Sequence, residues 1–94
     1  MISVIVEEKV KEGQLEAFVE YMAEMIAITR QEDGCIAYGL HEAVDGSGSV
    51  VMIESWESKE ALDRHMESEH FKKFVPGSAV YKAEDSVIRV FGSL

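Results

Sequence analysis

Three segments of this chain, at residues 2–8, 50–57 and 86–91, carry β-branched and apolar side chains at both odd and even positions. Successive residues of a strand point to opposite faces of a sheet, so a sheet built from these segments would be apolar on both faces. Helices of the same chain can cover one face. We expect the same sheet of a second copy, related by a two-fold axis, to cover the other.

Two further segments have the three- and four-residue apolar spacing of an amphipathic helix. The first is predicted at about residues 14–32, and Gly34 after it can adopt the left-handed conformation that ends a helix. The second begins after Ser58, a good N-cap, is interrupted at Ser68, which can cap again, and is predicted to end at Pro76-Gly77.

Another strand, at residues 35–44, is joined to the strand at 50–57 by Asp45-Gly46-Ser47-Gly48-Ser49, whose glycines suit a hairpin turn. The order of elements predicts an α+β fold, a ferredoxin-like β-α-β-β-α-β sandwich with both helices on one face of an antiparallel sheet. With 94 residues, the chain is expected to form a single domain over residues 1–94. Pairing of two bare sheet faces would make a homodimer, a dimeric α/β barrel.

Charge and composition exclude several classes of binding partner and covalent feature. The 18 acidic residues outnumber the 9 lysines and arginines, and the net charge of −9 disfavours nucleic acid and anionic membranes. No apolar run approaches the roughly 20 residues of a membrane span, and the first residues indicate a strand and not a signal peptide, so we expect a cytoplasmic protein. Cys35 is the only cysteine, which excludes an internal disulfide, and is expected to be a core residue.

Functional residue types are densest between Glu54 and Phe71. Together with two motifs before them, they form this pattern: Gly34-Cys35, Tyr38, Glu54-x-Trp56-x-Ser58, Ala61-Leu62-x-x-His65 and His70-Phe71. This pattern closely resembles the antibiotic biosynthesis monooxygenase (ABM) family of small dimeric α/β barrels, and most of all its branch of quinol monooxygenases. The likeness covers nearly the whole chain. It is less specific for substrate, because the family includes oxygenases, isomerases and members with no known reaction.

The resemblance implies a cofactor-independent monooxygenase. A small aromatic polyol or quinol would be held in a cleft between helices and sheet, deprotonated, and oxidised by direct electron transfer to molecular oxygen. The chain has no Gly-x-Gly-x-x-Gly fingerprint and no Gly-Lys-Ser loop, so no nucleotide cofactor is expected. Two alternatives stay open: an isomerase of a small carbonyl compound, and a non-catalytic ligand-binding dimeric module.

His65 is the candidate catalytic base, because an imidazole that titrates near neutrality can take a phenolic proton. The candidate substrate-binding residues are Trp56, Tyr38, Phe71 and His70. Each has a structural alternative: Trp56 can anchor the second helix, His65 can be a hydrogen-bonded core residue, and His70 can cap a helix. Tyr38 is preferred to His41 because the two have opposite parity on one strand and cannot both line one cleft.

No metal or haem site is predicted. The three histidines His41, His65 and His70 contain no i, i+4 pair, and no carboxylate completes a recognisable ligand pattern. In a haem-degrading relative of the family, the site consists of an Asn on the first strand, a Trp on the second helix and an axial His ten residues later. The matching positions here hold Val6, His65 and Val75, so haem degradation is not expected.

Overall fold

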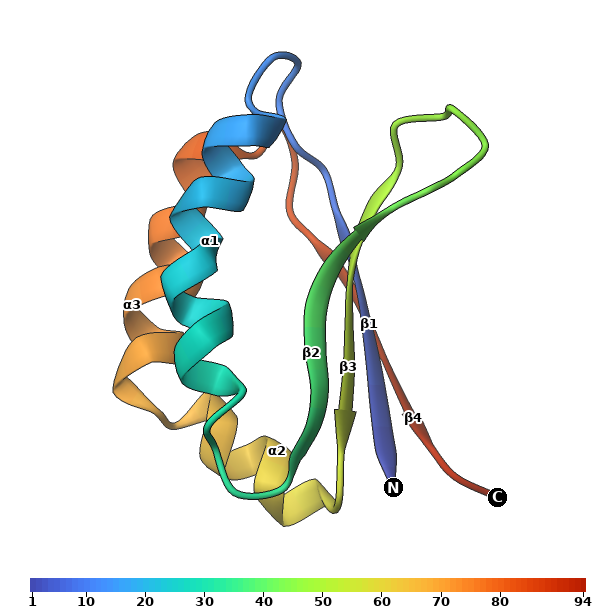
Figure 1. The fold of residues 1–94 in the computed structure, drawn as a ribbon, viewed down its shortest axis with the longest axis vertical. Helices are drawn as coiled ribbons and strands as arrows, with labels where there is room; N and C mark the ends of the chain where they lie inside the picture. The colour runs from blue at the N-terminus through green and yellow to red at the C-terminus, as the bar shows by residue number, and fades with distance from the viewer.

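A computed structural model describes all of residues 1–94, and its elements follow the predicted order (Figure 1). The strands are β1 (Ile2–Glu8), β2 (Cys35–Glu42), β3 (Val50–Trp56) and β4 (Val87–Gly92). The helices are α1 (Leu15–Thr29), α2 (Lys59–Met66), α3 (Glu69–Gly77) and the short 3-10 helix η1 (Ser78–Tyr81). The predicted α+β class and β-α-β-β-α-β order are confirmed. No helix combines the length and the apolar character that crossing a bilayer requires.

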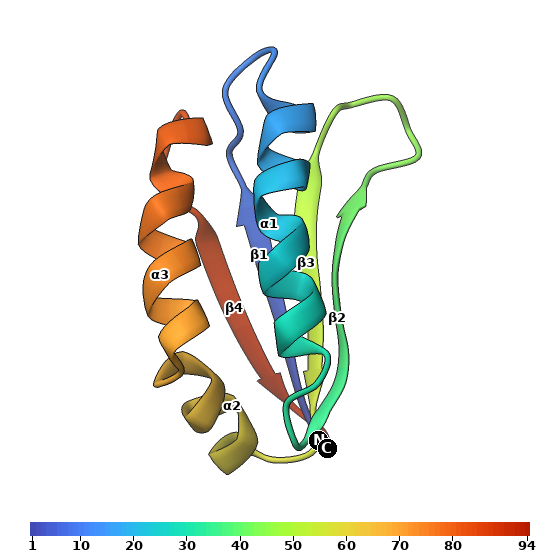
Figure 2. The same ribbon diagram turned by 60° about the vertical axis from the view of Figure 1, so that its left-hand side comes forward.

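The four strands form one antiparallel sheet in the order β2-β3-β1-β4, and the helices lie on one face of it (Figures 1 and 2). Register places four residues in a row across the face that the helices cover: Tyr38, Glu54, Val4 and Val90. The core lies between this face and the helices, with Phe18, Met25 and Trp56 fully buried.

The other face of the sheet has no helix over it (Figure 1). Ile5 of β1 is paired with Ile53 of β3, and both side chains are 39% exposed. Val87 and Phe91 on β4 are exposed as well. The expectation that these strands are apolar on both faces is therefore confirmed, and the second copy that would cover this outer face stays a prediction.

Helix α1 ends three residues earlier than predicted, because the chain turns after Thr29. The Glu32 amide donates to the Thr29 carbonyl at 3.0 Å, and the Cys35 amide donates to the Glu32 carbonyl at 3.2 Å. Gly34 has a φ of 85°, the left-handed conformation expected of it. A Cβ at Gly34 would lie 2.6 Å from the Cβ of Ala61, so only glycine lets this turn pack directly on α2.

Both predicted caps of the second helical region are confirmed. Ser58 Oγ accepts from the Ala61 amide at 3.1 Å, and Ser68 Oγ accepts from the Phe71 amide at 3.3 Å. The predicted helix end at Pro76-Gly77 is confirmed, because α3 ends at Gly77. The 3-10 helix η1 follows directly, and Ser78 Oγ donates to the Val75 carbonyl at 2.7 Å, which supports the turn in which proline lacks an amide hydrogen.

Candidate active site

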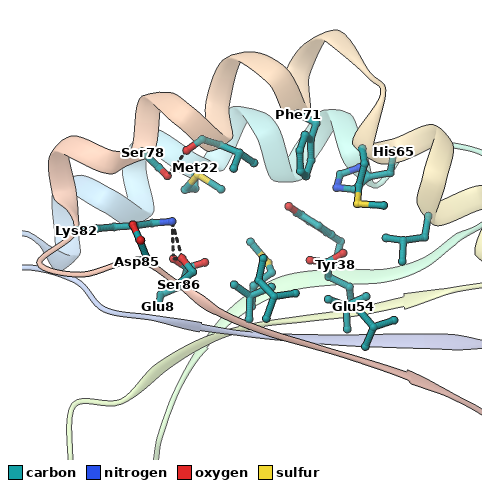
Figure 3. Close-up of a pocket in the computed structure, with 18 of the residues that line it drawn as sticks. Glu8, Met22, Tyr38, Glu54, His65, Phe71, Ser78, Lys82, Asp85 and Ser86 are labelled. Atoms are coloured by element: carbon teal, nitrogen blue, oxygen red, sulfur yellow. Dashed lines mark hydrogen bonds and ion pairs between the residues drawn. The ribbon is translucent and has the colours of Figure 1, made fainter.

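A cavity of about 370 Å³ lies between the helices and the covered face of the sheet (Figure 3). Its walls are mostly apolar, with Met22, Met52 and Phe71 among them. Its polar side chains gather at two ends, with Tyr38 and His65 near one end (Figure 3). A largely apolar space of this size with a few polar groups is typical of a small-molecule site.

His65 of α2 is 1% exposed and is held by a carboxylate. Its Nδ1 lies 2.7 Å from Oε2 of Glu32. A carboxylate oxygen accepts hydrogen bonds, so Nδ1 donates and the lone pair is left on Nε2. Nε2 makes no hydrogen bond within the chain. It is not fully buried either, because Thr29 Oγ1 is the single fully buried side-chain nitrogen or oxygen without a partner. Since His65 lines the cavity, Nε2 is reached from there.

Burial lowers the pKa of His65 below its ordinary value, and the hydrogen bond to Glu32 opposes this only in part. The imidazole is therefore neutral at neutral pH, which is the form that can accept a proton. A carboxylate that fixes the tautomer and stabilises the imidazolium once it forms is the arrangement of the general base in a Ser-His-Asp triad.

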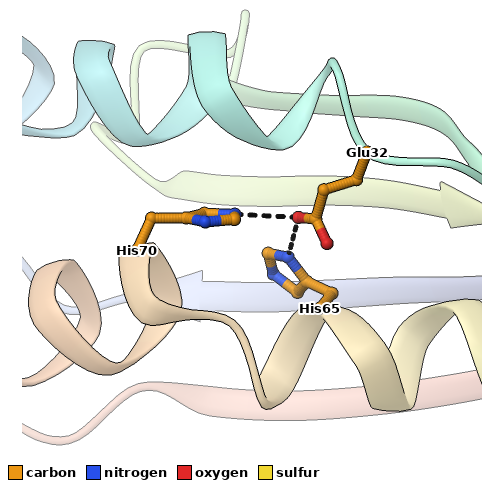
Figure 4. Close-up of side chains that lie close together, drawn as sticks. All are labelled: Glu32, His65 and His70. Carbon is orange, nitrogen blue, oxygen red and sulfur yellow. Dashed lines mark hydrogen bonds and ion pairs between the residues drawn. The ribbon is translucent and has the colours of Figure 1, made fainter.

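Glu32 reaches His65 because the turn after α1 packs on α2 at Gly34. The Glu57 amide donates to the Gly34 carbonyl at 2.8 Å, which ties this turn to the end of β3. The same Oε2 of Glu32 lies 2.9 Å from Nε2 of His70 at the start of α3 (Figure 4). Sequence reasoning missed Glu32, because only the folded turn brings it to the two histidines.

Aromatic rings surround His65. The ring centroids of Trp56, Phe71 and Tyr38 lie 4.7, 5.2 and 5.3 Å from the imidazole centroid. Tyr38, His65 and Phe71 line the cavity, whereas Trp56 and His70 do not. Trp56 is fully buried and packs against His65, and His70 contacts the same oxygen of Glu32 as His65 does. Of the predicted site residues, three thus reach the cavity wall and two support them.

Glu54 is a buried carboxyl that sequence reasoning did not assign to the site. It lines the cavity, is 6% exposed, and its Oε1 accepts from Trp56 Nε1 at 3.0 Å. Burial raises the pKa of Glu54 to about 7, although the Trp56 hydrogen bond acts in the opposite direction. Burial and then the neighbouring Glu54 charge raise the pKa of Tyr38. Parity could have found Glu54, because it shares a strand face with Met52 and Trp56.

The other polar end of the cavity holds a partly buried ion pair (Figure 3). Lys82 Nζ lies 3.1 Å from Glu8 Oε2 and donates to Ser86 Oγ at 2.7 Å, and Ser86 Oγ donates to Glu8 at 3.0 Å. Glu8 shares the covered face of β1 with Val4, so parity could have indicated it. Nothing in the sequence pattern indicates Lys82, which follows η1 on a connecting segment.

Replacing Glu54 by glutamine should remove a pH dependence of stability. The pKa is 4.5 in an unperturbed chain and about 7 in the fold, so between these values the folded state keeps a proton that the unfolded state has lost. The free energy of unfolding therefore falls as pH rises through this window.

Urea unfolding at about pH 5 and about pH 8 measures this effect. The parent should lose about 2 to 3 kcal/mol relative to Glu54→Gln between the two conditions. Glutamine keeps the oxygen that accepts from Trp56, so the hydrogen bond is matched. If parent and Glu54→Gln differed in their free energy of unfolding by the same amount at both pH values, the raised pKa of Glu54 would be contradicted.

Comparisons with known proteins agree on one family. A family profile described as antibiotic biosynthesis monooxygenase matches residues 1–77. The "Probable quinol monooxygenase YgiN" of Escherichia coli is 30% identical in an alignment 84 residues long that covers 79% of this chain and 81% of that protein. Rv0793 of Mycobacterium tuberculosis is 46% identical over 50 residues, so the sequence match spans 53% of this chain and about half of that protein, 48%.

Solved structures agree along nearly the full length. The structure of Rv0793 superimposes with a TM-score of 0.88 at 30% identity, covering 99% of this chain and 94% of that one. A conserved protein from Methanosarcina mazei gives a TM-score of 0.90 at 28% identity, covering 96% of this chain and 89% of that one. These superpositions include β4, which lies beyond the residues that the family profile matches.

Proposed function

This chain belongs to the antibiotic biosynthesis monooxygenase family, and from that premise we propose that it is a cofactor-independent monooxygenase that oxidises a small aromatic polyol or quinol with molecular oxygen. The observation that carries the proposal is the neutral imidazole of His65, whose Nε2 faces an apolar cavity while its Nδ1 is held by Glu32. This geometry suits removal of a proton from a hydroxyl on an apolar ring.

The reaction begins with transfer of a phenolic proton to Nε2 of His65, and Glu32 stabilises the resulting imidazolium. The phenolate then transfers one electron to oxygen, and the substrate radical and superoxide combine to form a carbon–oxygen bond. The O–O bond breaks, one oxygen atom stays on the ring, and the other leaves as water. A quinol and oxygen thus give a hydroxyquinone and water, with the substrate supplying every electron.

The remaining residues of the cavity divide into contacts and supports. Tyr38 and Phe71 contact the substrate ring, and Trp56 and His70 are positioning residues that act through His65 and Glu32. Glu54, with a pKa of about 7, can exchange a second proton with the substrate or its peroxide. Polar groups at both ends of the cavity favour a flat ring that carries oxygen atoms at opposite sides (Figure 3).

The enzyme is proposed to act as a homodimer. The outer face of the sheet, with Ile5, Ile53, Val87 and Phe91, would be covered by the same face of a second copy. Burial of apolar surface stabilises at about 25 cal/mol per Å², which favours this pairing in a chain with a small core of its own.

Oxygen uptake by the purified protein tests the proposed function. Metal- and flavin-free protein should consume one oxygen molecule for each quinol or polyphenol oxidised in an oxygen electrode, and added catalase should release no oxygen, because the second oxygen atom becomes water. Return of half of the oxygen on adding catalase would indicate peroxide and contradict monooxygenation. Conversion of a carbonyl compound without oxygen uptake would favour an isomerase, and binding without turnover would favour a ligand-binding module.

A further inference from the structure

Glu32, His65 and His70 converge on one point from three different elements (Figure 4). Glu32 lies in the turn after α1, His65 in α2 and His70 in α3. One ligand atom from each, namely Oε2, Nδ1 and Nε2, lies within 4.8 Å of the others. We propose that these three side chains form a binding site for one divalent transition-metal ion such as Zn²⁺.

The donor atoms decide the class of ion. Two imidazole nitrogens and one carboxylate oxygen are the protein ligands of zinc sites that keep a fourth position for water. Imidazole also binds copper, nickel and iron, whereas magnesium and calcium prefer oxygen ligands. Glu32 is the carboxylate that completes the ligand set of His65 and His70, and the sequence pattern did not indicate it. His41 is not part of this set, because it lies on the outer face of the sheet.

The two distances to Glu32 need little adjustment. Nδ1 of His65 and Nε2 of His70 lie 2.7 and 2.9 Å from the same oxygen of Glu32. Ligand atoms about 2.0 to 2.1 Å from a tetrahedral zinc ion lie about 3.3 Å from each other, so each contact has to open by roughly half an ångström. Rotation of the Glu32 side chain supplies this change. When the ion binds, each ring proton that now points at the carboxylate moves to the other nitrogen of its imidazole, so both rings stay neutral.

The three side chains are held in place and can be reached. The His65 ring is packed between Trp56 and Phe71, and the backbone carbonyl of His65 accepts from Ser68 Oγ at 2.6 Å, which fixes the break between α2 and α3. The His70 and Glu32 side chains are 13% and 18% exposed, so an ion can enter from solvent. Ligands fixed in this way lose little entropy when they bind a metal.

Metal binding would affect the proposed reaction. An ion on Nδ1 of His65 forces the remaining ring proton of the neutral imidazole onto Nε2, which then cannot accept a proton from a phenol. The ion would therefore act as an inhibitor. This consequence rests on the proposed function, whereas the metal site itself does not.

Titration of untagged, chelator-dialysed protein with Zn²⁺ in competition with a chromophoric chelator tests the site. We expect one ion per chain. Glu32→Gln and His70→Gln should each weaken binding by at least about 10- to 100-fold, since even loss of an outer partner of a ligand typically costs that much. His41→Gln is the matched control, because His41 pairs on the outer face, and it should bind as the parent does.

Cobalt gives a second readout that needs no substitution. One equivalent of Co²⁺ should give the parent a visible absorption band and should shift the ring protons of His65 and His70 in the NMR spectrum but not those of His41. Absence of saturable one-to-one binding would overturn the proposal. So would parental affinity in both cluster variants, or cobalt shifts confined to His41.

Discussion

Replacing His65 by alanine should lower the turnover of the best polyphenol substrate by about 10²- to 10⁴-fold, the usual contribution of a positioned general base. The Glu32 carboxylate keeps its second contact, 2.9 Å from His70, so the substitution does not leave it without a partner. The rate is measured as oxygen uptake with saturating substrate. His41→Ala, on the other face of the sheet, is the matched control.

Two further measurements separate a base from a core residue. Because burial lowers the pKa of His65, the rate of the parent should fall on acidification with a midpoint below the ordinary value of 6.5. Added imidazole should restore part of the activity of His65→Ala by occupying the space that the ring leaves. If the variant folds and oxidises the substrate at the parental rate with the same pH profile, His65 is not the base.

Replacing Ile53 by aspartate should convert the proposed dimer into monomers. Ile53 is paired with Ile5 and with Gly39, so it lies at the centre of the outer face. A two-fold axis would bury the new carboxylate of each copy in one interface, and an unpaired buried charge costs about 3 to 5 kcal/mol. The two carboxylates together should raise the dimer dissociation constant by at least about 10³-fold.

Sedimentation velocity at micromolar concentration measures this result. The parent should sediment with about twice the mass of its 10.5 kDa chain, and Ile53→Asp with the mass of one chain. Val80→Asp introduces the same charge at an exposed apolar residue of η1 and should stay dimeric. A parent that is monomeric throughout, or an Ile53→Asp variant that sediments like the parent, would refute pairing through this face.

Periodicity was sufficient to predict the fold. Runs of β-branched and apolar residues mark the strands, and three- and four-residue apolar spacing marks the helices; both depend on local geometry, which the sequence displays directly. The helix end at Pro76-Gly77 was predicted as well, but the 3-10 helix η1 that follows it was not. The Ser78 hydroxyl supports that turn by donating to the Val75 carbonyl, a contact that composition and spacing do not reveal.

The site was predictable only in part. Tyr38 and His65 could be selected because aromatic and imidazole side chains on covered faces stand out. Glu54 was accessible to the same parity argument but was not assigned a role. Glu32 could not be found, since it reaches His65 only because the turn after α1 packs on α2 at Gly34. Its contact with His65 joins residues 33 positions apart in the sequence. That turn also displaced the predicted end of α1.

The most direct test of the account is the fate of oxygen-18 gas during oxidation of a quinol by metal- and flavin-free protein. Mass spectrometry of the product should show one oxygen-18 atom on the ring, and labelled product should form about 10²- to 10⁴-fold more slowly with His65→Ala. Product formed by the parent without oxygen-18, or labelled at the same rate by His65→Ala, would contradict monooxygenation in this cavity with His65 as the base.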